Sequence, residues 1–286
     1  MAKRIPWENS QLWTRIKAQS AHGLQTGDLQ PIETEVTQVE SGGLSFVVRI
    51  LTNISRKEKA LKQQGKSKPA NPFLPYDQNL YVSDITETHL CLLNKFKVVD
   101  NHFLIVTREF EPQENWLTLA DFEALSMCLS EVNGLAFYNG GRDAGSSQPH
   151  KHLQVVPYSN SLTDFPIEKA IALTTDGQSS LLPFAHAIAR NINTKDPLNL
   201  LNTYQQLLTS VGIDGPYEGE QSAPYNLLCT HRWMMIVPRV QEKYADISVN
   251  SLGFAGSLLV KNKEKLAELE SIGPIELLKQ VAQNKT

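Results

Sequence analysis

Cysteine is scarce in this chain of 286 residues, which contains only Cys91, Cys128 and Cys229. The three are widely separated and form no C-x-x-C pair, so the sequence indicates neither a disulfide framework nor a cysteine zinc site. This cysteine usage is typical of a reducing compartment. We therefore expect a cytoplasmic location.

Long apolar runs and a strong charge of one sign are also missing. No stretch approaches the roughly 18 apolar residues of a membrane-spanning helix, and the N-terminal MAKRIPWENSQLW lacks the apolar core of an export signal. The formal net charge of −3 argues against broad nucleic-acid binding, which needs a basic face. We expect neither a membrane nor a nucleic-acid partner, and the oligomeric state stays open.

The hydrophobic content of 41% is enough for a large folded core. Periodicity predicts strands at 46–51, 103–107, 225–230 and 233–237, and helices at 9–19, at 199–211 and over the last 25 residues, with Pro274 starting one. A further helix is expected from a Thr118 cap to Asn139-Gly140-Gly141. A strand-rich echo of 103–156 around 225–260 suggests two related halves.

The segment Pro149-His150-Lys151-His152-Leu153-Gln154 carries the most chemistry. Strand alternation would place His150, His152 and Gln154 on one face, with Lys151, Leu153 and Val155 on the other. Three polar groups on one buried face would each need a partner, although a solvated strand face remains an alternative. Two histidines without a nearby cysteine or carboxylate are too few ligands for zinc, so no metal site is predicted.

A neutral imidazole can attack phosphorus and form a covalent phosphoramidate. His152, flanked on both sides by polar groups, is the natural nucleophile. The preceding Gly145-Ser146-Ser147-Gln148 offers donors for phosphoryl oxygens, although such a turn is often only a chain reversal. The remaining histidines have no such neighbours and are expected to be structural or exposed; they are His22, His89, His102, His186 and His231.

The segment FYNGGRDAGSSQPHKHLQVVP resembles the transferase branch of the histidine-triad superfamily, in which glutamine replaces the third histidine; Gln154 is that glutamine here. Four further blocks are similar, in order, to the diadenosine tetraphosphate phosphorylases, also called ATP adenylyltransferases. They are NPFLPYDQNLYV, NKFKVVDNHFLIVTREF, PYNLLCTHRWMMIVPR and NSLGFAGSLLVK. The likeness spans roughly residues 40–265.

The resemblance implies an α+β, histidine-triad-like fold with an antiparallel sheet and two related halves. Residues 1–165 would form the half with the catalytic motif and residues 166–286 the half that completes the substrate site. Only the first half would keep a reactive histidine, since Thr230-His231-Arg232 lacks the H-x-H pattern. The implied reaction is reversible phosphorolysis of diadenosine tetraphosphate by phosphate to ATP and ADP, with AMP carried on His152. It needs no covalent cofactor, and a divalent cation such as Mg²⁺ could accompany the nucleotide.

By the same matching, His150 and Gln154 support catalysis. The implied substrate-binding residues are Lys57, Asn94, Lys95, Asn139, Gly145, Ser146, Ser147, Gln148, Asn250 and Lys261. Lys59 remains an alternative to Lys57. A tetraphosphate carries about four negative charges, so a mildly acidic chain has to bring lysines from distant segments to it.

Three other functions are compatible with parts of this pattern. A dinucleoside polyphosphate hydrolase would use water as the acceptor, but a third histidine marks that branch and Gln154 argues against it. A nucleotide-binding sensor without turnover is disfavoured by the intact His150, His152 and Gln154. Galactose-1-phosphate uridylyltransferases share the motif but usually carry metal-ligand patterns, and no cysteine pair is present. The acceptor range and the base preference stay open.

Overall fold

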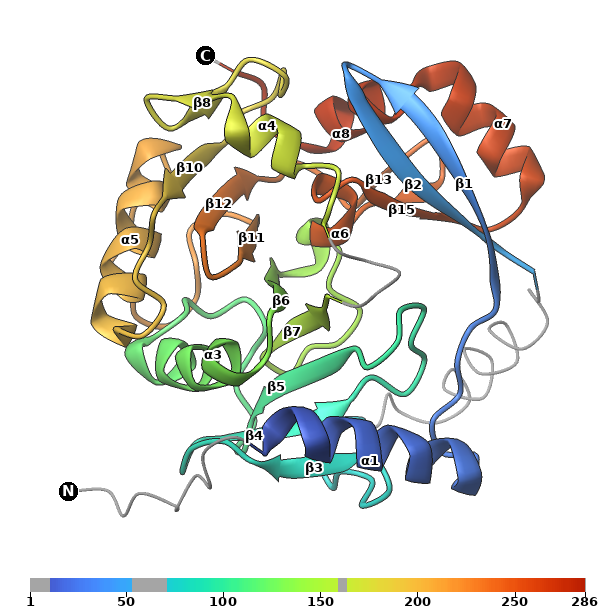
Figure 1. Ribbon diagram of the computed structural model, residues 1–286. Helices are drawn as coiled ribbons and strands as arrows, with labels where there is room; N and C mark the ends of the chain where they lie inside the picture. Colours follow the sequence, from blue (N-terminus) through green and yellow to red (C-terminus); the bar gives the residue numbers. More distant parts are fainter. Residues whose placement is uncertain (1–10, 53–70, 159–163, 286) are drawn as a thin grey trace.

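The computed structural model describes residues 11–52, 71–158 and 164–285. An eight-stranded antiparallel sheet forms its centre (Figure 1). In spatial order its strands are β10 (Ala187–Arg190), β12 (Trp233–Pro238), β11 (Tyr225–Cys229), β6 (Gly134–Gly140), β7 (His152–Pro157), β5 (Phe103–Thr107), β4 (His89–Leu93) and β3 (Tyr81–Asp84). The predicted α+β class with an antiparallel sheet is confirmed.

Six strands of the sheet, from β10 to β5, are arranged symmetrically about the pairing of β6 with β11, and β4 and β3 extend one side. On one side the chain forms β5, α3 (Leu119–Glu131), β6 and β7; on the other it forms β10, α5 (Pro197–Ser210), β11 and β12. In each half the last strand inserts between the first two, so the order β5-β7-β6 is mirrored by β11-β12-β10. The two halves therefore share one topology and one sheet. The exact boundary at 165/166 stays a prediction.

Helices cover one face of the sheet. Residues of α1 (Leu12–Thr26), α3 and α5 form a single apolar cluster with side chains from that face, including Ile16, Phe122 and Tyr204. The opposite face packs against a small sheet of β1 (Thr34–Ser41), β2 (Leu44–Leu51) and β15 (Ser257–Val260), together with α7 (Lys263–Ile272) and α8 (Pro274–Val281). The shorter elements are α4 (Glu168–Ala172), α6 (Ser251–Phe254), the 3₁₀ turn η1 (Arg142–Ala144), β8 (Thr174–Thr175), β9 (Gln178–Ser179), β13 (Lys243–Tyr244) and β14 (Ile247–Ser248).

Several predicted elements are confirmed, and one is wrong. Strand β5 has the predicted bounds, β11 pairs with β12, Pro274 begins α8, and Thr118 caps α3 through a capping box with Asp121. The helix after Thr118, however, ends at Glu131, and Gly134–Gly140 form β6. Because β6 is buried on both faces, its apolar run has no polar alternation that would distinguish it from a helix.

The three cysteines are buried and unpaired. Among the described residues, no helix is long and apolar enough to cross a membrane.

Candidate active site

The histidine motif is held by an adjacent segment, Glu111–Gln113. Pro112 forms an antiparallel bridge with His150, and the Gln113 amide nitrogen donates to the Pro149 carbonyl at 2.8 Å. The Gln113 side chain hydrogen-bonds the backbone of His152. Its Oε1 accepts from the His152 backbone nitrogen at 2.8 Å, and its Nε2 donates to the His152 carbonyl at 3.3 Å. Gln113 is itself fully buried. The backbone at His152 is thus fixed from both sides.

The His152 ring is held in one tautomer. Its Nδ1 lies 2.7 Å from the carbonyl oxygen of His150, and because a carbonyl only accepts, Nδ1 must carry the proton. The lone pair is then on Nε2, which makes no hydrogen bond to any described residue. The residue is 5% exposed, and the Phe73 ring lies 5.2 Å from the imidazole, centroid to centroid. This is the arrangement that a nucleophilic imidazole requires.

Burial lowers the pKa of His152 to about 4, and the neighbouring His150 acts in the same direction. The hydrogen bond to the His150 carbonyl opposes the shift without cancelling it. Desolvation disfavours the charged imidazolium. His152 is therefore neutral at physiological pH, with Nε2 available.

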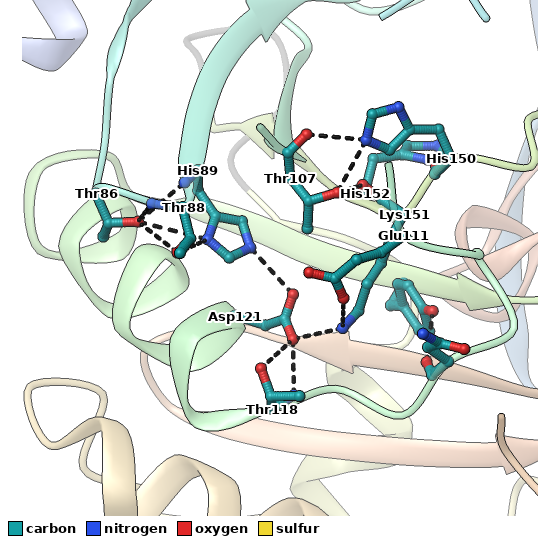
Figure 2. Close-up of polar contacts among 12 residues, drawn as sticks. Thr86, Thr88, His89, Thr107, Glu111, Thr118, Asp121, His150, Lys151 and His152 are labelled. Atoms are coloured by element: carbon teal, nitrogen blue, oxygen red, sulfur yellow. Dashed lines mark hydrogen bonds and ion pairs between the residues drawn. The ribbon is translucent and has the colours of Figure 1, made fainter. Parts of the chain in front are cut away.

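The His150 ring, by contrast, has both nitrogens engaged. Figure 2 shows the side of the ring that contacts Thr107. Asn71 accepts from the Phe73 backbone nitrogen through Oδ1 at 3.0 Å, so it turns its Nδ2 towards Nδ1 of His150, 2.9 Å away. The proton of His150 is then on Nε2, which donates to the Thr107 carbonyl at 2.9 Å. The ring is fully buried, and burial lowers its pKa. His150 acts on His152 through its main-chain carbonyl.

The predicted alternation holds along β7. Leu153 and Val155 enter the helix-covered core, while His152 and Gln154 lie on the other face. Gln154 is half-buried and pairs with Leu104 on β5 and Phe137 on β6. His150 precedes the strand.

His102 belongs to this neighbourhood, so the expectation that it has no neighbours in the motif is wrong. Asn94 donates through Nδ2 to Nδ1 of His102 at 3.2 Å, its orientation set by Oδ1 accepting from the Phe96 backbone nitrogen. The His102 proton is therefore on Nε2, which is buried and has no partner at full hydrogen-bond geometry among the described residues. Burial lowers the pKa of His102 to about 4; nearby Gln154 opposes the shift and His152 adds to it.

Asn139 connects three elements. Its Oδ1 accepts from Nδ2 of Asn226 on β11 at 3.0 Å, and from the backbone nitrogen and hydroxyl of Ser251 on α6 at 3.0 and 2.7 Å. This oxygen is therefore committed to the fold. A substrate contact by Asn139 stays a prediction.

The turn at Gly145 lies directly against the predicted C-terminal substrate segment. Gly145 has φ +88°, and a Cβ here would lie 2.6 Å from the Val249 carbonyl oxygen and 2.9 Å from Cα of Asn250. Asn250 caps α6 by accepting from the Leu252 nitrogen at 3.0 Å. Glycine thus allows two predicted site segments to touch.

The polar residues of this turn differ in exposure. The Ser146 hydroxyl donates to the Gln148 carbonyl at 2.9 Å, Ser147 is exposed, and Gln148 is half-buried. Their contacts with substrate stay predictions.

The predicted substrate-binding lysines that the structure describes, Lys95 and Lys261, share no contact partner. Lys95 is half-buried, and its carbonyl accepts from Gln30 at 2.8 Å. Lys261 is exposed and pairs with Asp246 at 2.9 Å. Lys57 and its alternative Lys59 lie outside the described residues. Roles for these lysines stay predictions.

Sequence reasoning missed Gln113, Asn71 and Phe73 as residues that hold the motif. Asn71 and Phe73 lie in the block NPFLPYDQNLYV, which carried the resemblance but no assigned role. Gln113 has no local signal, because its partners lie in distant parts of the chain. In the described part of the chain, no cluster of three or more His, Cys, Asp or Glu could hold a metal ion.

Comparisons with known proteins agree with this geometry. The Ap4A phosphorylase N-terminal domain family matches residues 2–173, and the ATP adenylyltransferase C-terminal domain family matches residues 180–284. Diadenosine 5',5'''-P1,P4-tetraphosphate phosphorylase 2 of Saccharomyces cerevisiae is 31% identical over 239 residues, covering 71% of this chain and 72% of that protein. Protein APA1 of the same yeast is 26% identical over 276 residues, covering 85% and 84%.

Solved structures give the same answer. The crystal structure of yeast Ap4A phosphorylase Apa2 superimposes with a TM-score of 0.78 at 26% identity, covering 100% of this chain and 97% of that chain. The same enzyme in complex with Ap4A has a TM-score of 0.79 at 25% identity, covering 97% and 99%. The chain therefore belongs to the Ap4A phosphorylase family, whose C-terminal part is the ATP adenylyltransferase domain.

Proposed function

We propose that this chain cleaves diadenosine tetraphosphate by phosphorolysis, with inorganic phosphate as acceptor and ATP and ADP as products, and that His152 carries the adenylyl group in between. Family membership and the names of its relatives support the overall reaction. The role of His152 rests on one observation: Nδ1 is tied to the His150 carbonyl, which leaves an unprotonated Nε2 in a buried site.

The reaction takes two displacements at one phosphorus. In the first, Nε2 of His152 attacks the phosphorus of one adenylyl group; the N–P bond forms, and the P–O bond to the departing ATP breaks. In the second, a phosphate oxygen attacks the same phosphorus, the N–P bond breaks, and ADP leaves. Between the steps the substituted ring is cationic, and the His150 carbonyl accepts from its Nδ1–H throughout. That hydrogen bond stabilises the charge.

Gln154 is placed one strand repeat beyond His152 on the same face, where its amide could donate to oxygens of the transferring group. The substrate arrives with its own counterions, and a divalent cation such as Mg²⁺ bound to the polyphosphate would be part of it. Phosphate, ATP and ADP are the other expected small-molecule partners. With unpaired cysteines, the expected place of action is the cytoplasm.

The test uses labelled diadenosine tetraphosphate with and without phosphate. With phosphate, we expect ATP and ADP; without it, we expect AMP bound to His152 through an acid-labile, alkali-stable bond that mass spectrometry can locate. His152→Ala should form no adduct, and its turnover should fall on the order of 10⁶-fold. His231→Ala, which removes an exposed histidine of the second half, is the matched control and should keep both.

Two results would contradict the proposal. Equal rates without phosphate, giving AMP and ATP, would make the protein a hydrolase. An adduct on His150 would move the nucleophile. His150→Ala keeps the carbonyl that holds His152 but loses the Asn71 and Thr107 contacts that anchor it, so slow activity should remain.

A further inference from the structure

The lysine between the two histidines points into the core. The Lys151 side chain is only 1% exposed. It extends towards α3, where its ammonium group meets Asp121 (Figure 2). Its Nζ is 2.8 Å from Oδ2 of Asp121 and 3.1 Å from Oε2 of Glu111. A buried ammonium is costly unless it is paired, and here two carboxylates pair it.

Asp121 is anchored from several sides. In the first turn of α3, its Oδ2 accepts from the backbone nitrogen and hydroxyl of Thr118 at 2.7 and 2.8 Å. Its Oδ1 lies 3.1 Å from Nε2 of His89 on β4, and Nδ1 of His89 lies 2.9 Å from the Thr88 hydroxyl. Burial favours the neutral acid, but the hydrogen bond from His89 and the charge of Lys151 outweigh it and lower the pKa of Asp121 to about 2. The carboxylate is therefore a fixed negative charge.

The backbone of Lys151 is part of the frame around the nucleophile. Its nitrogen donates to the Glu111 carbonyl at 2.8 Å, and its carbonyl accepts from the Thr107 nitrogen at 3.2 Å. The peptide before it carries the carbonyl that holds Nδ1 of His152. A side chain clamped at Lys151 thus restrains the short segment that orients the imidazole.

Stability alone is a weak explanation for this ion pair. The carboxylate and the ammonium are each 1% exposed on their side chains, and replacing such a pair by packed apolar residues is often neutral or stabilising. What apolar residues cannot supply is direction. Two charge-assisted contacts fix the position of Nζ, one to Asp121 on α3 and one to Glu111 in the segment that pairs with the motif.

We infer that Lys151 and Asp121 are positioning residues, which hold the segment from His150 to His152 so that Nε2 of His152 faces the phosphorus of the substrate. The inference rests on the proposed function of His152. Neither residue touches substrate, because Lys151 points to the helix-covered side of the sheet.

Three variants separate positioning from a merely structural role: Lys151→Met, Asp121→Asn, and the double variant that carries both. The double variant leaves no unpaired charge in the core, and asparagine still accepts from Thr118. The measurements are kcat, the KM for diadenosine tetraphosphate, and the single-turnover rate of adduct formation on His152. Since small misplacements of reacting groups are expensive, kcat and the adduct rate should fall roughly 10- to 100-fold. KM should stay within about twofold, because substrate contacts are untouched.

Leu125→Ala is the matched control. It removes a fully buried side chain from the same helix without touching the network, so it loses stability through a cavity and should keep kcat at temperatures where it is folded.

A folded double variant with wild-type kcat would overturn the inference, as would a raised KM with unchanged kcat. If none of the three variants folds, the network serves folding and the inference is also overturned. A failure of the proposed function is seen separately, because wild-type protein would then form no adenylate on His152.

Discussion

The two halves of the sheet share one strand topology but carry different side chains at equivalent positions. Strands β5 and β7 pair over four rungs, and so do β10 and β12. In the first half, Val106 pairs with His152 and Leu104 with Gln154. In the second half, the corresponding rungs join Arg190 to Trp233 and Ile188 to Met235.

Trp233 and Met235 thus occupy the places of His152 and Gln154, and both are buried in the apolar cluster of that face. The two halves therefore differ here in side chains and not in backbone fold. His152 and Gln154 are polar where the second half has the core residues Trp233 and Met235.

The histidines that precede β5 and β10 extend this contrast. Nδ1 of His186 donates to the Phe184 carbonyl at 2.8 Å, and its Nε2 accepts from the Ser179 nitrogen at 2.9 Å, so the backbone uses both ring nitrogens. At the matching place, His102 has one nitrogen bound by Asn94 and the other left beside Gln154. In the second half, both nitrogens of the equivalent histidine are bonded to the backbone. In the first half, Nε2 of His102 is, among the described residues, an unused donor on the face that carries His152 and Gln154.

The largest effect is expected when the first half receives a residue of the second. Gln154→Met places there the residue found at Met235, and it should lower kcat on the order of 10²-fold while the fold persists, because one donor to the transferring group is lost. Steady-state kinetics with diadenosine tetraphosphate and phosphate measure the loss. Met235→Leu, a swap of similar volume, should leave kcat unchanged. Wild-type activity in Gln154→Met would show that the amide has no part in transfer.

The acid limb of the pH profile tests whether the reactive histidine is buried and neutral. With a pKa of about 4 for His152, kcat/KM should stay flat from pH 7 to about 5 and fall roughly tenfold per unit below pH 4. A solvent-exposed imidazole would place this limb near pH 6.5 instead. A limb there would contradict the burial of His152.

Stability should change over a related window. His102, His152 and His186 each have a folded pKa of about 4, below the unfolded value of about 6.5. The unfolded chain binds more protons between these values, so their contribution is complete above pH 6.5 and is lost as the pH falls towards 4.

The smallest expected effect on catalysis is at His186. His186→Ala leaves the Ser179 nitrogen buried without an acceptor, which should cost about 1–3 kcal/mol of unfolding free energy. Urea denaturation gives this value, and kcat should not change. A drop in kcat for the folded variant would show that His186, in the second half, contributes to the reaction.

The sequence predicted what depends on neighbours along the chain. The Thr118 cap of α3 and the strand at Phe103–Thr107 follow from local patterns, and so does the separation of His152 and Gln154 from Leu153. The motif also predicted His152 as the nucleophile; the structure shows its Nδ1 held by the His150 carbonyl, and the role in transfer stays a proposal.

What the sequence could not supply are partners brought together by the sheet. Gln113 lies in a loop that is far from His152 in the chain, and its side chain hydrogen-bonds the His152 backbone. His102 lies near Gln154 only because β5 pairs with β7. The Glu131 helix end was missed because β6 is apolar on both faces. In each case the deciding contact joins segments that are distant in the chain, and periodicity carries no information about such a partner.

The pairing of β6 with β11 also determines where this protein can be divided. All residues of both strands are buried, and Asn139 and Asn226 hydrogen-bond across the pairing. A fragment that stops after the first half would present β6 as an open edge of apolar side chains and unpaired amides. Such an edge recruits strands from other molecules, so we expect the isolated half to aggregate, although the two family domains meet near residues 173–180.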